Sequence, residues 1–258
     1  MTKKGHALVT GASGGLGREI ALELARLGYP TLLVSSTGKI HSVSEEISEK
    51  YGLESKSFVV DLSSEEATMA FARKMANEYE VCILVNNVGL GGSGEFQRTP
   101  VEHIAKILRL NVFCTALLTR ELLPNLLRNT PARILNISSM AALTPTAYKT
   151  VYPASKAFVN AFSYGLREEL RGSGVSVSVA VPGAMATNPE IRGRIEKQGA
   201  LGRATLKPTG EIARKFVKGM MKGRRTISVN PLGLFLSKAV PGMLRTYILS
   251  KIVRRETL

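Results

Sequence analysis

Residues 6–17 read HALVTGASGGLG, an apolar run that leads into a glycine-rich turn of the form T-G-x-x-x-G-x-G. A helical pattern of apolar residues begins directly after the turn, at Leu16. Glycines at 11, 15 and 17 allow the backbone to turn tightly and to approach a diphosphate, and the free N–H groups of the next helix attract that anion. The strand before the turn and the helix after it are the context that such a site requires. The stretch therefore predicts the opening of a dinucleotide-binding fold.

The rest of the chain continues this alternation of short apolar runs and amphipathic helical patterns. Alternation at this spacing is typical of a parallel sheet with right-handed crossovers. We therefore expect a single α/β domain over residues 1–258, doubly wound and of Rossmann type, with a seven-stranded, mostly parallel sheet flanked by helices. The expected strands are 6–10, 31–35, 56–60, 81–86, 132–138, 175–181 and 226–229. The expected helices begin at Leu16 and span 43–51, 65–79, 101–128, 152–171 and 210–222.

Composition places the chain among ordinary globular proteins, with 44% hydrophobic and 21% charged residues. The two cysteines, Cys82 and Cys114, lie in apolar or helical stretches, and we expect reduced thiols in a cytoplasmic protein. The apolar run near the N-terminus is short, so we expect a first strand there rather than a secretory signal. The three histidines are far apart in the sequence, and we expect no metal site.

The formal net charge of +15 is concentrated at the end of the chain. Residues 191–258 hold 16 Lys and Arg against 3 Asp and Glu. Such a field attracts anions, which include a phosphorylated cofactor, an acidic carrier, an anionic lipid surface and nucleic acid.

The end of the second expected strand indicates which dinucleotide is bound. An acid at this place would hold the ribose 2′-hydroxyl of NAD. This chain instead reads Ser35-Ser36-Thr37-Gly38-Lys39, and no acid follows until Glu45. Hydroxyl groups and Lys39 would suit a 2′-phosphate, so we expect NADP(H) as the preferred cofactor and NAD(H) as the alternative.

Three further residues form a candidate catalytic set. Ser139 follows the fifth expected strand, and Tyr152 and Lys156 come after it. Tyr152 and Lys156 are four residues apart and share one face of a helix. A nearby ammonium favours the phenolate, so we expect Lys156 to lower the pKa of Tyr152 toward the working range. A serine hydroxyl at the carboxyl end of a strand lies where such folds bind ligands, and it could bond the same carbonyl oxygen.

With these motifs in place, the chain resembles the short-chain dehydrogenase/reductases over about residues 5–230. The matching pieces, in the family's order and spacing, are TGASGGLG (10–17), Asp61, NNVG (86–89), Asn111, Ser139, YPASK (152–156) and PGAMAT (182–187). The resemblance implies an oxidoreductase that interconverts a carbonyl and an alcohol with a nicotinamide cofactor.

The resemblance also implies a role for each matching residue. Tyr152 would be the acid in reduction and the base in oxidation, Ser139 would polarise the carbonyl, and Lys156 would bind the nicotinamide ribose. Asn111 would anchor a water in a proton relay. Asp61 would hold the adenine amino group, and Asn87 and Gly89 would line the adenosine side. Pro182, Gly183 and Thr187 would hold the carboxamide. The full cofactor set expected is Thr10, Gly11, Ser13, Gly15, Leu16, Gly17, Ser35, Ser36, Lys39, Asp61, Leu62, Asn87, Gly89, Tyr152, Lys156, Pro182, Gly183 and Thr187.

Two departures from the family pattern concern the cofactor. Val88 replaces the usual alanine of NNAG, which adds bulk near the adenosine pocket. Ser36 stands where NADP-preferring members usually carry an arginine, which weakens the NADP prediction without supplying the acid that NAD would need.

Two segments leave alternatives open. Residues 184–207 correspond to the substrate lid of the family, and their arginines and lysines would contact an anionic substrate or simply face solvent. Residues 231–258 form a basic amphipathic extension that would lie on an anionic membrane, cap the substrate pocket or pack on a partner subunit. Tails of this kind in ketoacyl and steroid reductases favour a small or lipophilic carbonyl substrate. The resemblance also implies a homodimer or homotetramer, paired through the helices at 101–128 and 152–171.

Competing hypotheses are an NAD-dependent alcohol dehydrogenase that runs in oxidation, a non-catalytic protein that binds NADP or nucleic acid, and a peripheral membrane scaffold. No nucleic-acid-binding signature is present in the sequence, so we expect no nucleic-acid partner.

Overall fold

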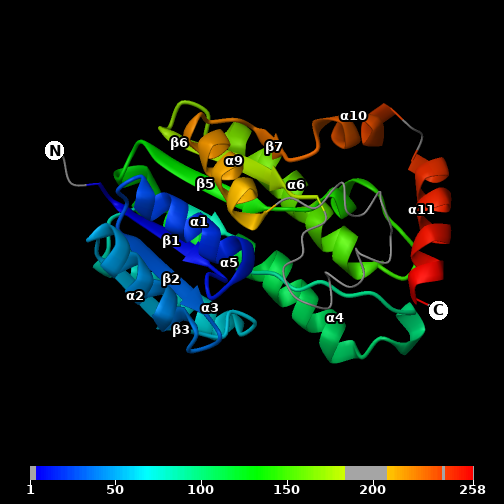
Figure 1. Cartoon of the computed structure of the whole chain (residues 1–258), viewed down its shortest axis with the longest axis horizontal. Coiled ribbons are helices and arrows are strands. Elements are labelled where there is room, and N and C mark those ends of the chain that lie inside the picture. Colours follow the sequence, from blue (N-terminus) through cyan, green and yellow to red (C-terminus); the bar gives the residue numbers. More distant parts are fainter. Residues whose placement is uncertain (1–3, 184–207, 240–241, 258) are drawn as a thin grey trace.

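The computed structural model describes residues 4–183, 208–239 and 242–257. Seven strands form one sheet in the order β3-β2-β1-β4-β5-β6-β7. Every neighbouring pair in the sheet is parallel, so the expected mostly parallel sheet is confirmed in a stricter form (Figure 1). The strands are β1 (His6–Thr10), β2 (Thr31–Ser35), β3 (Ser55–Val59), β4 (Val81–Asn86), β5 (Ala132–Ile137), β6 (Val175–Val181) and β7 (Thr226–Ser228).

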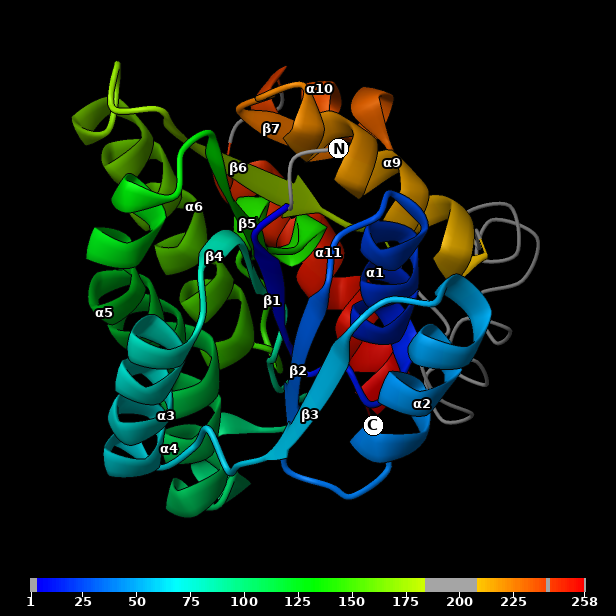
Figure 2. The ribbon, with the colours of Figure 1, turned by 90° about the vertical axis from the view of Figure 1, so that its left-hand side faces the viewer.

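The helices cover both faces of this sheet. They are α1 (Gly15–Arg26), α2 (Ile40–Tyr51), α3 (Glu65–Glu78), α4 (Val101–Leu108), α5 (Cys114–Arg128), α6 (Val151–Glu169), α9 (Thr209–Met221), α10 (Pro231–Ala239) and α11 (Gly242–Thr257). Short helical turns are η1 (Phe96–Arg98), η2 (Arg109–Phe113) and η3 (Met140–Leu143). Figure 2 shows α1, α2 and α9 on one face of the sheet and α3, α5 and α6 on the other.

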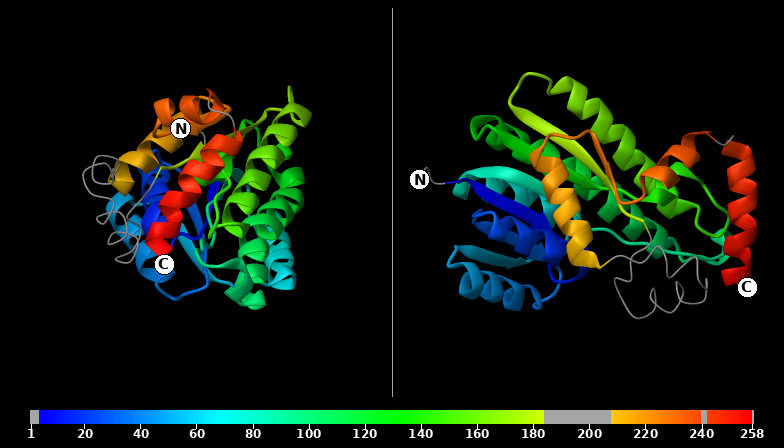
Figure 3. Two further views of the ribbon diagram at one scale, coloured as in Figure 1. Left: turned by 90° about the vertical axis from the view of Figure 1, so that its right-hand side faces the viewer. Right: turned by 45° about the horizontal axis from the view of Figure 1, so that its top comes forward.

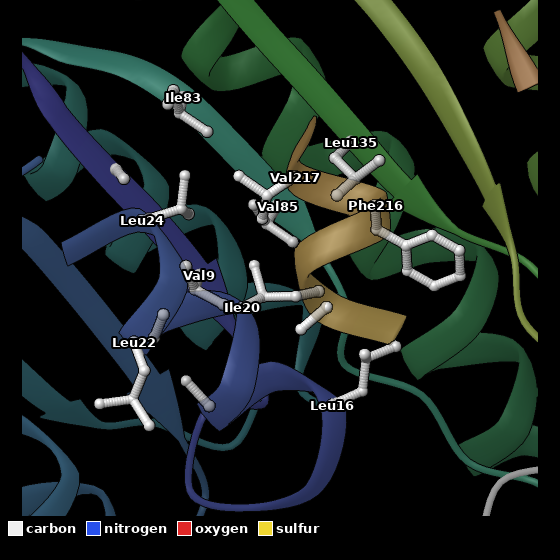
Figure 4. Packing of buried hydrophobic residues seen from close by; sticks show 14 of the residues in the cluster. Val9, Leu16, Ile20, Leu22, Leu24, Ile83, Val85, Leu135, Phe216 and Val217 are labelled. Carbon is white, nitrogen blue, oxygen red and sulfur yellow. The ribbon is translucent and has the colours of Figure 1, made fainter. Parts of the chain in front are cut away.

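Each face has its own apolar core, because strands buried on both sides carry apolar residues at successive positions. On the first face, Ile20 and Leu24 of α1 and Phe216 of α9 pack against Val9 and Val85 of the central strands (Figure 4). On the second face, Leu118 and Leu122 of α5 pack with Leu8 and Leu84. The two layers fix the carboxyl ends of β1, β4 and β5 side by side. The strand order reverses between β1 and β4, and this switch point is where folds of this kind bind ligands.

The expected boundaries differ from the observed ones by a residue at β3, β5 and β7, a difference that is usual at element ends. The helix expected over 101–128 shows a larger difference. It consists of α4, one π-helical turn (η2) and α5. Such turns interrupt α-helices where a side chain must be redirected, often at functional sites, and Asn111 lies at the centre of this one.

The C-terminal extension forms α10 and α11. Figure 1 places α11 beyond the carboxyl ends of the strands, at the far end of the molecule from the N-terminus, and Figure 3 shows it from two further directions. Within the described part of the chain, no helix has the length and apolar character needed to cross a membrane.

A buried asparagine ties the second helical layer to the sheet. Asn125 of α5 accepts a hydrogen bond from the Val81 N–H (3.0 Å), and its amide donates to the carbonyls of Ala76 (2.7 Å) and Tyr79 (2.9 Å). One side chain thus holds the start of β4 and the loop that precedes it.

We expect Asn125→Ala to lower the free energy of unfolding by about 2–3 kcal/mol, because it leaves one N–H and two carbonyls without partners in the interior. Urea unfolding would measure the change. Glu121→Gln on the same helix is the matched control, since it removes only the surface ion pair with Arg73 (3.4 Å) and should change stability little. Equal effects of the two substitutions would contradict this account of Asn125.

Candidate active site

The glycine-rich turn leaves a helix N-terminus open for an anion. Gly14 caps α1 without any side-chain hydrogen bond, and no acidic residue lies in the first helical turn. The N–H groups there are therefore available to a ligand. Gly11 and Gly15 have positive φ angles of 65° and 54°, which favour glycine. A Cβ at Gly17 would overlap the Gly11 carbonyl oxygen and stand 2.5 Å from the Asn87 amide nitrogen.

Thr10 and Asn87 join this turn to the end of β4. The Thr10 hydroxyl oxygen accepts hydrogen bonds from the N–H groups of Asn87 and Val88, both at 2.9 Å. In return, the Asn87 amide donates to the carbonyls of Thr10 (2.9 Å) and Gly11 (3.2 Å). In this structure, Thr10 and Asn87 thus hold the shape of the turn.

A pocket adjoins the turn at the ends of β2 and β3. It is lined by Gly11, Ser35, Ser36, Val60, Asp61, Leu62, Val88, Lys106 and Leu110. Asp61 accepts hydrogen bonds from the Ser63 N–H (2.9 Å) and hydroxyl (2.7 Å), and these lower the pKa of its carboxyl group. Ser35 donates to the Ser13 hydroxyl oxygen at 2.9 Å. Most of the residues expected on the adenosine side therefore gather around one pocket.

The expected cofactor residues differ in what they present there. Ser36 lines the pocket and is exposed, and Lys39 is exposed without being part of the lining, whereas the side chains of Leu16 and Leu62 are buried. Lys106 is a pocket residue that the sequence reasoning missed. It lies on α4, far along the chain from β2, and its charge also contributes to the lowered pKa of Asp61.

Ser139, Tyr152 and Lys156 lie together at the carboxyl end of β5. Ser139 caps η3 by accepting a hydrogen bond from the Ala141 N–H (3.1 Å), and its side chain also bonds that of Tyr152. The ammonium group of Lys156 is almost fully buried and donates to the Ile137 carbonyl (2.9 Å). The neighbouring Ser138 hydroxyl donates to the Lys156 carbonyl (3.1 Å), so β5 and α6 are pinned together at this point.

The pKa directions differ from the sequence expectation. Burial raises the pKa of Tyr152, and the hydrogen bond with Ser139 opposes this only in part. Burial also lowers the pKa of Lys156 to about 8. We had expected Lys156 to produce a net lowering for Tyr152. The ammonium is instead directed at the Ile137 carbonyl, and desolvation is the dominant influence on both groups.

Asn111 is fully buried and its side chain bridges two segments. Its carbonyl oxygen accepts from the Leu90 N–H (2.8 Å), and its amide donates to the Leu90 carbonyl (3.0 Å) and to the Ser155 hydroxyl oxygen (2.9 Å). Ser155 in turn donates to the Tyr152 carbonyl (2.7 Å). Asn111 thus positions the backbone of Tyr152, and its expected part in a water relay stays a prediction.

Gly89 lies beside two residues of the candidate active site. A Cβ at this position would stand 2.8 Å from the Asn111 side-chain oxygen and 3.1 Å from the Lys156 nitrogen. Its expected contact with the cofactor stays a prediction. A side chain would be pressed against both groups, and glycine keeps this space free.

A second pocket begins at Tyr152. Its walls come from the segment after β4, from α4 and from the start of α6. Apolar groups in the lining are Phe96, Ile104, Ile107 and Val151. Tyr148 also lines it and has a positive φ of 63°, a strained conformation for a bulky residue, and its carbonyl accepts from the Gly94 N–H (2.7 Å). Strain at a ligand-binding wall is a recurrent property of functional sites.

The last residues that are expected to contact the cofactor follow the end of β6. The Pro182 carbonyl accepts from the Met140 N–H (3.2 Å), and Gly183 faces Val229. Thr187 and the expected lid at 184–207 lie outside the described residues. Among the residues that the structure does describe, no group of His, Cys, Asp or Glu side chains is placed to hold a metal ion.

These features fit a nicotinamide dinucleotide. An uncapped helix N-terminus meets a turn that admits no side chain at Gly17, with the Asp61 pocket on one side and the Tyr152 pocket on the other. The crevice therefore offers an anion site at a helix N-terminus. A polar pocket lies on one side of this anion site, and a tyrosine hydroxyl with a lysine ammonium lies on the other.

Comparisons with known proteins agree with this geometry. A family model described as short chain dehydrogenase matches residues 5–197. The very-long-chain 3-oxoacyl-CoA reductase of Anas platyrhynchos is 39% identical over 186 residues, which cover 70% of this chain and 60% of that protein. The reductase of the same name from Bos taurus is 36% identical over 224 residues, 84% of this chain and 67% of that one. This chain thus spans about three fifths to two thirds of these relatives.

Among solved structures, a short-chain dehydrogenase from Sphingobium yanoikuyae in complex with NADPH superposes with a TM-score of 0.79. The two chains are 27% identical, and the match covers 88% of each.

We expect Gly17→Ala to weaken NADPH binding by at least about tenfold, because the added methyl group must push apart Gly11 and Asn87. Isothermal titration calorimetry would measure the dissociation constant. Gly14→Ala is the matched control in the same turn, since a Cβ there meets nothing within 4 Å and the backbone is extended. If the two variants bound NADPH equally well, the close packing at Gly17 would not shape the cofactor site.

The lowered pKa of Lys156 predicts a specific pH dependence of stability. Between pH 8 and 10.5 the folded chain binds fewer protons at Lys156 than the unfolded chain does, so this group's contribution to the free energy of unfolding rises with pH over that window. The cost of burying the ammonium is fully present below pH 8. The free energy of unfolding of the wild type, relative to that of Lys156→Met, should rise by up to about 3 kcal/mol across the window, at about 1.4 kcal/mol per pKa unit. Denaturant titrations of both proteins would test this, and parallel stability curves would refute it.

Proposed function

The chain belongs to the short-chain dehydrogenase family of oxidoreductases, and from this premise we propose that it reduces a ketone to an alcohol with NADP(H). The proposed substrate class is a lipophilic 3-oxoacyl thioester or a similarly apolar ketone. The observation that carries the proposal is the cluster of Ser139, Tyr152 and Lys156 at the carboxyl end of β5, where the dinucleotide crevice meets a partly apolar pocket.

The protein's own residues account for the proton and for the orientation of the carbonyl. The cofactor, when bound, supplies the hydride. The Tyr152 hydroxyl donates a proton to the carbonyl oxygen, and the Ser139 hydroxyl donates a hydrogen bond to the same oxygen. Because burial raises the pKa of Tyr152, its phenol stays protonated at neutral pH. A protonated phenol is the form that donates a proton to the carbonyl oxygen in reduction.

Lys156 complements this arrangement. With a pKa of about 8 it is largely protonated at neutral pH, so its positive charge stabilises the phenolate that forms as Tyr152 gives up its proton. The bond from its ammonium to the Ile137 carbonyl fixes the charge at the end of β5. Two further N–H donors on the same nitrogen remain for the cofactor ribose.

The cofactor preference rests on charge at the adenosine pocket. No acid follows β2 before Glu45. Ser36 and Lys106 line the pocket together with Asp61, and Lys39 follows Ser36 in the exposed turn after β2. A 2′-phosphate would meet cations and hydroxyl groups there. The Sphingobium structure, which contains NADPH, supports the same choice. NAD(H) remains the alternative cofactor, because Ser36 stands where an arginine would hold the phosphate.

The substrate class is supported by the pocket and by the relatives. Phe96, Ile104 and Ile107 offer apolar walls beside Tyr152. The relatives from Anas platyrhynchos and Bos taurus are named for the reduction of very-long-chain 3-oxoacyl-CoA. A long acyl chain would gain affinity by burying its methylene groups against such walls.

We further propose a cytoplasmic homo-oligomer that pairs through α6. Ala154, Ala157, Phe158 and Ala161 are exposed on this helix, and the Phe158 and Phe162 rings stack at 5.7 Å. Small and aromatic residues on one exposed face are suited to close helix packing.

The test of the reaction is NADPH oxidation in the presence of a long-chain 3-oxoacyl-CoA, followed at 340 nm for wild type and Tyr152→Phe. We expect the variant to lose activity by about 10³-fold while binding NADPH normally, because only the transferable proton is removed. Tyr164→Phe is the matched control on the same helix, since the Tyr164 hydroxyl meets Thr226 away from the crevice, at 3.1 Å. Retained turnover in Tyr152→Phe would refute the assignment, and faster turnover with NADH than with NADPH would refute the cofactor preference.

A further inference from the structure

Helix α11 exposes large apolar side chains. Met243 is 89% and Tyr247 is 60% exposed, and Leu244 and Ile248 are exposed beside them. These four positions follow the spacing of one helical face. Thr246, Ser250 and Val253, at the spacing of another face, are half-buried or buried. A surface helix normally turns its apolar stripe toward the core.

The preceding helix, α10, also exposes apolar side chains. Leu232 and Phe235 are 68% and 67% exposed. We call these exposed apolar residues of α10 and α11 (Leu232, Phe235, Met243, Leu244, Tyr247 and Ile248) the tail face. Large exposed apolar patches on soluble proteins mark interaction sites.

Basic residues border the tail face. Lys251 lies over the Tyr247 ring, with its nitrogen 4.5 Å from the ring centre, and Arg254 is exposed one turn further on. Residues 231–258 hold five Lys and Arg and a single acid, Glu256. The surface therefore combines apolar side chains with a positive field.

We propose that the tail face docks on an anionic lipid bilayer as an interfacial element. A helix with large apolar residues on one side and Lys and Arg beside them lies in the plane of a membrane, where the apolar side chains enter the headgroup boundary and the cations meet anionic lipids. A second copy of the chain is a poorer partner. Pairing about a two-fold axis would bring the tail's cations toward those of an identical tail.

The tail face is attached to the walls of the Tyr152 pocket. The Ala147 N–H donates to the Ser250 hydroxyl oxygen of α11 (2.9 Å), and the next residue, Tyr148, lines the pocket. Helix α10 contacts η3, which Ser139 caps. A docked tail thus brings the pocket close to the bilayer, and an acyl substrate could pass from lipid to the site. This delivery step rests on the proposed function, whereas the docking itself does not.

The experiment is co-sedimentation of the full chain with vesicles of phosphatidylcholine alone or with 30% phosphatidylglycerol. We expect binding to the anionic vesicles and at least about tenfold weaker binding for the triple variant Phe235→Ser/Met243→Ser/Ile248→Ser. The double variant Lys251→Gln/Arg254→Gln should lose its binding to anionic vesicles more than its binding to phosphatidylcholine vesicles. Added salt should weaken the binding of the wild type to anionic vesicles in the same way. Val59→Ser, an exposed apolar residue on the edge strand β3, is the matched control and should bind as wild type.

Two measurements keep docking separate from folding and catalysis. The thermal unfolding midpoint and NADPH oxidation with a short, water-soluble ketone should be the same for wild type and triple variant. Equal sedimentation of the wild type and a well-folded triple variant would overturn the proposal. So would a concentration-dependent dimer that the triple variant abolishes in sedimentation velocity, because it would assign the tail face to a second copy. If the wild type bound vesicles but did not reduce the ketone, the proposed function would be refuted and the docking proposal would stand.

Discussion

One hydroxyl group sets the geometry on which the site depends. The Thr10 side chain is fully buried at the end of β1 and accepts hydrogen bonds from two successive N–H groups at the end of β4. These N–H groups lie just beyond the β1–β4 ladder, at the switch point of the sheet, and the Asn87 N–H also reaches the Val85 carbonyl (3.1 Å). Because Asn87 returns two hydrogen bonds to the glycine turn, the phosphate-binding end of α1 and the segment that carries Gly89 form one rigid unit. Replacing the hydroxyl by a methyl group would remove the acceptor of two of these hydrogen bonds and leave the two from the Asn87 amide.

A second set of buried polar contacts connects this region to Tyr152, the proposed proton donor. Asn111 connects Leu90 to Ser155, and Ser155 connects to the Tyr152 backbone. Deeper between the sheet and the helices, the Asn86 amide donates to Thr119 and to Asn136, whose own amide donates to Ser163 of α6. Buried polar chains of this kind contribute little net stability, but they are costly when one partner is lost. They therefore fix the register of α5 and α6 against the sheet more sharply than apolar packing would, and the position of Tyr152 follows from that register.

Local patterns in the sequence were sufficient to predict the sheet and to bring the candidate catalytic residues together, but not to predict every position. Apolar runs placed all seven strands to within a residue or so, because strands buried on both faces leave a clear signal. The motif residues Ser139, Tyr152 and Lys156 lie together as their spacing suggested.

The π-turn at Asn111 has no local signal in the sequence, and the Asn111 side chain makes a long-range hydrogen bond to Leu90. Lys106 and Tyr148 reach their pockets through packing between distant segments, and no pattern in their own neighbourhoods indicates it. The direction of the Tyr152 pKa also could not be foreseen, because it depends on burial.

Burial acts on the two titrating groups in opposite senses and for the same reason. It raises the pKa of Tyr152 and lowers that of Lys156, so both groups move toward their neutral forms. The tyrosine is thereby kept as an acid, and the lysine keeps a pKa just above neutrality. Ligands that fill the crevice would remove more water and strengthen both shifts, unless they replace it with hydrogen-bonding groups. Ribose hydroxyls beside Lys156 would do this for the ammonium, and a carbonyl oxygen beside Ser139 and Tyr152 would accept the phenol proton. Burial thus favours the protonated phenol, and in the proposed reaction the ligands' own polar groups would determine when its proton moves.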